Sequence, residues 1–204
     1  MLRTIDQSNR ILESRALRGM FEARKEVFVD LLKWDLPVLA DRYEVDHFDD
    51  GEAVYLIVTD LEARHLASAR LLRTTRPALL DSLYPDLADG AVPRGEDILE
   101  ITRFCLSRGV GARLRREARD RLLVGLVEYA LANEVRRYTG VAELSWFEQI
   151  CTFGWECRSL GKPCLHDGRW LVGLCIDIDD GTIDRLAAGG ITAASREATA
   201  ARAA

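Results

Sequence analysis

Long apolar runs, histidine clusters and a signal-like start are missing from this chain of 204 residues. No apolar run approaches the roughly 20 residues of a membrane-spanning helix, so we expect no membrane span. No apolar region follows the first residues, so we expect no signal peptide. The three histidines are scattered and do not match the usual ligand spacings, which argues against a metal site.

Cys-x-x-Cys pairs are also absent, and the number of cysteines, five, is odd. This usage is typical of reduced thiols in a cytoplasmic protein. The net charge of −5 lacks the basic excess of a nucleic-acid-binding protein. What the chain does have is 48% hydrophobic residues, which at this length predicts one domain with a real core.

Apolar periodicity predicts helices and strands that alternate along the chain. Strands are expected at residues 2–5, 53–59, 64–73, 97–107, 141–146, 164–166 and 170–179. Helices are expected at residues 9–32, 78–84, 114 to about 135, and 147–154, with an acidic loop at residues 35–52. This order predicts an α/β fold with a mixed central sheet flanked by helices. We expect a single domain over residues 1–185 and a flexible, Ala-rich tail over residues 186–204.

The strand at residues 97–107 is apolar except where Glu100, Thr102 and Arg103 interrupt it. Strict alternation places Glu100 and Arg103 on opposite faces, and a bulge between them would bring them together. The strand is followed by a glycine turn and a helix N-terminus, which together make a ready anion site. This order resembles the GNAT acyltransferase fold, in which that turn takes the phosphopantetheine arm of the acyl donor. Arg108 and Gly111 fit the GNAT turn pattern, but Arg113 stands where Gly or Ala belongs.

The stretch from residue 24 to residue 49 is rich in groups suited to one small charged ligand. Phe28 and Trp34 offer aromatic faces, which attract cations. Asp46 and Asp49 can hold an ammonium, and a guanidinium can hold a carboxylate; Arg24 and Arg103 both fit that role. A zwitterion that also carries a soft cation would use all of these groups.

Taken together, these motifs resemble the signature of acyl-homoserine-lactone synthases, the LuxI-type autoinducer synthases of bacterial quorum sensing. The resemblance covers roughly residues 1–180 and departs from the family pattern only at Phe48 and Tyr84. The motifs that carry it are Arg24-x-x-Val27-Phe28, Trp34, Glu44-x-Asp46-x-Phe48-Asp49, Ser68-Ala69-Arg70-Leu71, Glu100-x-x-Arg103-Phe104, and Gly154-Trp155 with Leu160-Gly161-Lys162-Pro163.

The resemblance implies transfer of an acyl group from an acyl thioester to the amine of S-adenosylmethionine. Lactone closure and release of methylthioadenosine would follow. The acyl thioester would be carried by acyl carrier protein or by coenzyme A. S-adenosylmethionine and the thioester are substrates, and no cofactor is expected.

Each step of that reaction then has candidate residues. The catalytic candidates are Glu100, Glu44 and Arg103, with Glu100 as the base and Glu44, acting through a water, as the alternative. For S-adenosylmethionine they are Arg24, Phe28, Trp34, Asp46, Asp49, Arg70 and Arg103. For the acyl group and pantetheine they are Tyr84, Thr102, Phe104, Ser145, Trp146 and Phe147. For a carrier protein or the phosphates of coenzyme A they are Arg108, Arg113, Arg115, Arg116 and Arg119. Walls of an acyl tunnel are expected at Leu99, Ile101, Leu144, Trp146, Phe147, Cys151 and Phe153.

Two other functions stay open from the sequence. One is an ordinary GNAT acyltransferase that uses coenzyme A and a different amine. The imperfect glycine turn and the acidic and aromatic N-terminal half count against it. The other is a non-catalytic module that binds an acyl group or a nucleotide, and the presence of Glu100 and Arg103 counts against that.

Overall fold

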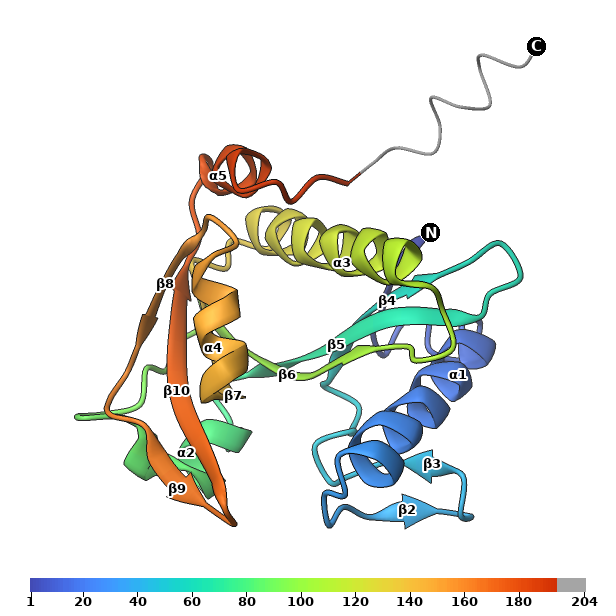
Figure 1. Ribbon diagram of the computed structural model, residues 1–204, viewed down its shortest axis with the longest axis horizontal. Coiled ribbons are helices and arrows are strands. Elements are labelled where there is room, and N and C mark those ends of the chain that lie inside the picture. Colours follow the sequence, from blue (N-terminus) through green and yellow to red (C-terminus); the bar gives the residue numbers. More distant parts are fainter. Residues whose placement is uncertain (194–204) are drawn as a thin grey trace.

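The computed structural model describes residues 1–193 and contains an eight-stranded sheet (Figure 1). The strands are ordered β1-β4-β5-β6-β7-β10-β8, and β9 pairs with β10. Among the strands of residues 1–193, only β6 and β7 run parallel, and every other pair in this sheet is antiparallel. The bounds are β1 Leu2–Ile5, β4 Val54–Thr59, β5 His65–Arg73, β6 Ile98–Leu106, β7 Arg137–Glu143, β8 Glu156–Ser159, β9 Cys164–His166 and β10 Arg169–Asp177. The predicted mixed sheet is therefore confirmed.

The sheet splits at the parallel pair, β6 and β7. Strands β6 and β7 pair over four residues, Ile98–Ile101 with Arg137–Gly140, and then diverge. Just beyond this point the register between β5 and β6 shifts, and Arg103 has a φ of +50°. A bulge of this kind bends its strand and adds twist. In Figure 1 the half of the sheet that ends at β6 diverges from the half that begins at β7.

Helices cover the two faces of the β1–β6 half of the sheet. One face packs against α3 (Ala112–Ala132), whose Leu122 and Leu126 are fully buried. The other face packs against α1 (Ser14–Arg24), which continues as a π-helix from Lys25 to Leu31. Shorter elements are α2 Leu79–Leu83, a 3₁₀ turn Pro85–Leu87, α4 Leu144–Cys151 and α5 Thr182–Ala188. This arrangement leaves the split between β6 and β7 beside α4 (Figure 1).

Several predicted boundaries were wrong. Residues 144–146 begin α4 and do not continue a strand, because β7 starts earlier, at Arg137, and Glu143 is extended at the helix N-cap. The expected loop at residues 35–52 contains a small hairpin, β2 Val38–Leu39 with β3 Tyr43–Glu44. Strand β8 was not predicted at all. The expected helix at residues 9–32 starts at Ser14.

The C-terminal boundary also differs from the expected one. The predicted boundary at residue 185 falls inside α5, and Leu186 and Ile191 are buried in the core beneath it. Helix α5 contacts α3 (Figure 1). The rest of the predicted tail, residues 194–204, lies outside the described residues.

Candidate active site

Six charged side chains form one buried cluster between α1, β3, the loop after β3, β5 and β6. We call this cluster the ion network; its members are Arg24, Arg70, Arg103, Glu44, Asp46 and Asp49. Three cations face three anions, so the network is balanced. Isolated charges are costly to bury, and pairing with hydrogen bonds is what makes this burial tolerable.

Two arginines make two-pronged contacts with aspartates. The Nη1 and Nη2 groups of Arg24 donate to Asp49 at 2.8 and 2.9 Å, and the Nε of Arg24 donates to Glu44. The Nη1 and Nη2 groups of Arg70 donate to Asp46 at 2.6 and 3.1 Å. The planar guanidinium matches a carboxylate in this geometry, which makes such pairs stronger than single contacts. The network is therefore precisely oriented as well as balanced.

The third arginine, Arg103, sits at the edge of the network. Its Nη2 donates to Asp46 at 2.7 Å and to Glu44 at 3.0 Å. The side chains of Arg103 and Asp46 are 7% and 8% exposed, whereas those of Arg24, Glu44 and Asp49 are fully buried. Arg103 and Asp46 are thus the two members that solvent, or a ligand, can reach.

Electrostatics in the network favour the charged forms. Burial alone would raise the pKa of Asp49, but the Arg24 hydrogen bonds and the charges of Arg24 and Arg70 lower that pKa well below its usual range. Tyr55 also donates its hydroxyl to Asp49 at 3.0 Å. Asp49 therefore stays ionised through the physiological pH range.

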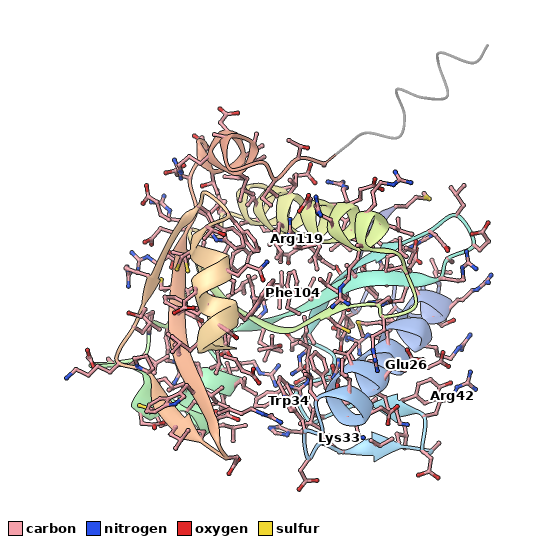
Figure 2. All side chains as sticks on the ribbon, in the orientation of Figure 1. Glu26, Lys33, Trp34, Arg42, Phe104 and Arg119 are labelled. Carbon is pink, nitrogen blue, oxygen red and sulfur yellow. The ribbon has the colours of Figure 1, made fainter. Side chains whose placement is uncertain are left out.

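Two stacked aromatic rings lie against the network. The rings of Phe28 and Trp34 are 5.0 Å apart with an angle of 15° between their planes. The Arg103 guanidinium lies 5.8 Å from the Phe28 centroid, and that of Arg169 lies 5.3 Å from Trp34. Phe28 is on the π-helix, a local geometry often found at functional sites. Figure 2 shows Trp34 between the two halves of the molecule.

Glu100 lies apart from the ion network. Both of its carboxylate oxygens accept from the Leu80 N–H, at 3.0 and 3.1 Å, and within residues 1–193 no arginine forms an ion pair with it. Burial raises its pKa to about 7, although the Leu80 hydrogen bonds act in the opposite direction. The bulge predicted between Glu100 and Arg103 is displaced along the strand: the register with β5 is unbroken from Leu99 to Thr102 and shifts at Arg103 and Phe104. Within residues 1–193 no hydrogen bond or ion pair joins the side chains of Glu100 and Arg103. A carboxyl group that titrates near neutral pH is suited to general base catalysis.

An apolar cavity of about 70 Å³ occupies the split between β6 and β7. Arg103 and Thr102 stand at its polar end, and Thr102 also accepts a hydrogen bond from Arg70 at 2.9 Å. Figure 2 shows Phe104 near the middle of the molecule, below α3. The lining residues are Ile101, Thr102, Arg103, Phe104, Leu123, Leu126, Gly140, Val141, Ala142, Trp146, Ile150, Phe153, Trp155, Leu174 and Ile176.

The predicted acyl-site residues divide into two groups. Thr102, Phe104 and Trp146 line the cavity, as do Ile101 and Phe153 from the expected tunnel. The others are not among its lining residues: Tyr84, Leu99, Leu144, Ser145, Phe147 and Cys151. Tyr84 instead packs edge-on against His166, with centroids 5.3 Å apart, and Ser145 is exposed.

The predicted basic face is also divided. Arg108, Arg115 and Arg116 are exposed, and among the described residues they have no acidic partner. Arg113 pairs with Glu117 at 2.9 Å. Arg119, on α3 (Figure 2), is half-buried, bonds Asp120 and lies 5.1 Å from the centroid of the Phe153 ring. Among the five predicted arginines, Arg108, Arg115 and Arg116 can therefore bind an anionic ligand without giving up an ion pair within residues 1–193.

Two neighbours of the site were not predicted. Tyr55 supports Asp49, and Arg169 donates to the Leu32 carbonyl at 2.8 Å while covering Trp34. Tyr55 lies in the expected strand at residues 53–59, and nothing in the pattern distinguished it from the other strand residues. Arg169 is 137 positions away from Leu32, and no local pattern signals a contact over that distance.

Comparison with known proteins decides the family. A family model described as autoinducer synthase matches residues 8–186 of the chain. The chain belongs to this family. An acyl-homoserine-lactone synthase from Ralstonia nicotianae is 34% identical over 178 residues, 84% of this chain and 85% of that protein. An isovaleryl-homoserine lactone synthase from Bradyrhizobium diazoefficiens is 28% identical and covers 91% of this chain and 84% of its own length.

Solved structures agree with the family. BjaI, a CoA-dependent acyl-homoserine lactone synthase solved with SAM and isopentyl-CoA, superposes with a TM-score of 0.83 at 27% identity, covering 94% of this chain and 90% of that one. An acyl-CoA N-acyltransferase from Pseudomonas aeruginosa, 18% identical with a TM-score of 0.57, covers 86% of this chain and 97% of its own and shares the fold alone. The chain is thus an acyltransferase of the acyl-homoserine-lactone synthase type with a GNAT-like fold, as the sequence motifs indicated. Within residues 1–193 no helix is long and apolar enough to cross a membrane.

Proposed function

We propose that the chain transfers an acyl group from an acyl thioester to the amine of S-adenosylmethionine and then closes the lactone with release of methylthioadenosine. One observation carries this proposal. The segment Thr102–Phe104 belongs both to the wall of the apolar cavity and, through Arg103 and the Thr102–Arg70 bond, to the ion network. A site for an acyl chain and a site for a charged acceptor therefore meet at one bulge. The solved relative that holds SAM and isopentyl-CoA together supports the same pairing.

The acceptor would bind at the exposed edge of the network. Its ammonium would pair with Asp46 and its carboxylate with Arg103, which exchange their mutual contact for contacts with the ligand. Its sulfonium would lie against the Phe28–Trp34 stack. Arg24, Arg70, Glu44 and Asp49 would hold these groups in position from beneath.

Acyl transfer then needs a proton acceptor and an oxyanion site. Glu100, with a pKa near 7, would remove the proton that makes the ammonium a nucleophile, directly or through a water. The amine nitrogen forms a bond to the thioester carbon, and the carbonyl oxygen becomes an oxyanion. Arg103 and Phe104 have no partner on β5 in the strand register, so their backbone N–H groups are candidates for holding that oxyanion. Collapse of the intermediate expels the thiolate.

Lactone closure is intramolecular. The methionine carboxylate oxygen attacks its own γ-carbon, the bond from that carbon to sulfur breaks, and neutral methylthioadenosine leaves. Holding the two ends close supplies much of the advantage of such a step. Asp46 and Arg103 would provide that orientation. We also propose a cytoplasmic location, which the five free thiols support.

The acyl donor would carry its phosphates or acidic carrier protein to the glycine turn after β6. Arg108, Arg115 and Arg116 are exposed at this turn and the start of α3, where they can meet such anions. Both acyl carrier protein and coenzyme A fit this chemistry.

The test is a reconstituted reaction of the purified chain with S-adenosylmethionine and acyl donors on both carriers. Free thiol, methylthioadenosine and acyl-homoserine lactone should appear in equal amounts by mass spectrometry. Thiol release without methylthioadenosine would identify an ordinary acyltransferase instead. If no donor released free thiol or methylthioadenosine, the proposed catalysis would be rejected.

A further inference from the structure

The cavity between β6 and β7 is small, and its inner wall is aromatic. Four rings follow one another along it, with centroids 5.5 Å apart for Phe104 and Trp146, 5.8 Å for Trp146 and Phe153, and 6.2 Å for Phe153 and Trp155. All four rings line the cavity. A chain of touching rings sets a boundary that a flexible aliphatic wall would not.

Two of these rings, Phe153 and Trp155, are held in place by further contacts. The Trp155 indole N–H donates to the Ile150 carbonyl at 3.0 Å, and both Phe153 and Trp155 are buried. The Arg119 guanidinium lies over the Phe153 ring, 5.1 Å from its centroid, and donates to Asp120 at 2.7 Å. Moving these rings would break packing and polar contacts together, so the wall resists expansion.

The volume limits what this wall can enclose. An apolar cavity of about 150 Å³ accommodates benzene, which has six carbons. At the same volume for each carbon, the present cavity of about 70 Å³ takes about three carbons. These three carbons do not include the carbonyl carbon of the acyl group, which would lie at the polar end of the cavity, beside the Thr102–Phe104 bulge.

We propose that the acyl group of the natural donor is short, with four or five carbons, straight or branched, and that Trp146 sets this upper limit on its length. This inference rests on the proposed function. Trp146 is one of the two middle rings of the series, in contact with both Phe104 and Phe153. It is only partly buried, on the first turn of α4, so its removal opens the cavity without emptying the core.

The test compares the thioesters of butyryl, isovaleryl, hexanoyl, octanoyl and dodecanoyl groups, on coenzyme A and on acyl carrier protein, with S-adenosylmethionine held constant. We expect kcat/KM to be highest for butyryl or isovaleryl and to fall about tenfold for each of the first surplus methylenes. In Trp146→Ala the octanoyl to butyryl ratio should rise at least tenfold. A wild-type chain that prefers octanoyl or dodecanoyl overturns the proposal, whatever the variant does.

Trp170→Ala is the matched control, because Trp170 is 54% exposed and lies outside the cavity. It should leave the chain-length profile unchanged, and an equal shift in both variants would contradict a role for Trp146 in the limit. Quenching of tryptophan fluorescence by the same thioesters, without acceptor, gives a profile of dissociation constants that does not depend on turnover. If no donor yields lactone but short thioesters still bind at least tenfold more tightly than long ones, the proposed reaction fails while the size limit stands. If long thioesters bind as tightly, the size limit fails as well.

Discussion

The ion network and the apolar cavity meet at the same bulge but are built on opposite principles. In the network, each side chain is held by named partners, such as the two-pronged contact of Arg24 with Asp49. In the cavity, side chains such as Trp146 and Phe153 contribute shape, and their contacts are not directional in the same way. A single substitution in the network should therefore cause a large loss of stability or activity. A single substitution in the cavity should mainly change which acyl groups are accepted.

The largest effect is expected from breaking the network. Replacing Arg24 by Met would leave Asp49 and Glu44 buried with one partner fewer, and uncompensated buried charge costs about 3–5 kcal/mol of unfolding free energy. Urea unfolding, followed by circular dichroism, measures this loss. Arg42→Met is the matched control. Its guanidinium pairs with Glu22 at 2.6 Å but is 66% exposed, so we expect a loss of at most about 1 kcal/mol. Equal losses in the two variants would mean that burial in the network does not add to the cost of losing an arginine.

The next effect concerns Glu100, the carboxyl group that the network leaves out. Glu100→Gln should lower kcat/KM about 10²-fold, because a glutamine cannot accept the ammonium proton. In the wild type, kcat/KM should rise as pH increases through about 7, since the base works only when deprotonated. The variant should lose that rise. Near-normal turnover in the variant would transfer the role to Glu44 or to water.

Glu100→Gln also has a signature in stability that sharpens the contrast with Asp49. Because burial raises the pKa of Glu100 from 4.5 to about 7, the folded chain holds this proton longer than the unfolded chain. Its contribution to the unfolding free energy is complete below about pH 4.5 and is lost as pH rises to about 7. The lowered pKa of Asp49 acts in the opposite sense, since that stabilisation is lost as pH falls below the unfolded value of 3.8. The glutamine variant should lose only the first dependence.

A smaller effect is expected on the exposed basic face. Reversing Arg115 and Arg116 to glutamate should raise the KM for a carrier-bound acyl donor several-fold, and 0.5 M salt should narrow the difference because exposed charges are screened. Arg15→Glu with Arg18→Glu is the matched control: both arginines are exposed on α1, and the net charge changes equally. An identical rise in KM in the control pair would mean that the change in net charge, and not the position of Arg115 and Arg116, causes the effect.

The sequence predicted the residue types of both regions but not their partners. Glu44, Asp46 and Asp49 were expected to face a ligand, and their position in the chain gave no sign that Arg24, Arg70 and Arg103 would saturate them. Those pairs span 20 to 59 positions, and side-chain pairing over such distances depends on how the sheet brings β5 and β6 under α1. Three polar residues in an apolar strand suggested a bulge between Glu100 and Arg103, but the bulge lies further along, at Arg103 and Phe104, and it joins Arg103 to the network and not to Glu100.

The cavity was less accessible to sequence reasoning than the network. Trp146 was expected at the end of a strand, whereas it lies on the first turn of α4. Trp155 was not expected in the wall because the strand that follows it, β8, was not predicted. The volume of the cavity depends on how several helices and strands pack together, so it cannot be predicted from the sequence pattern of any one of them.

The smallest effect tests whether the network imposes strain on its surroundings. The β2–β3 hairpin carries Glu44 into the network, and its turn holds Ala40 and Asp41 at φ values of +52° and +53°. Both values belong to the left-handed region, which costs an alanine about 1–2 kcal/mol relative to glycine. Ala40→Gly should relieve that cost, lose about 0.4–1 kcal/mol through the freer unfolded chain, and so stabilise the fold by about 0.5–1 kcal/mol in urea unfolding. Ala91→Gly, at an exposed alanine with ordinary φ, should instead destabilise. Equal destabilisation by both changes would mean that the turn is relaxed and that Glu44 reaches Arg24 without strain.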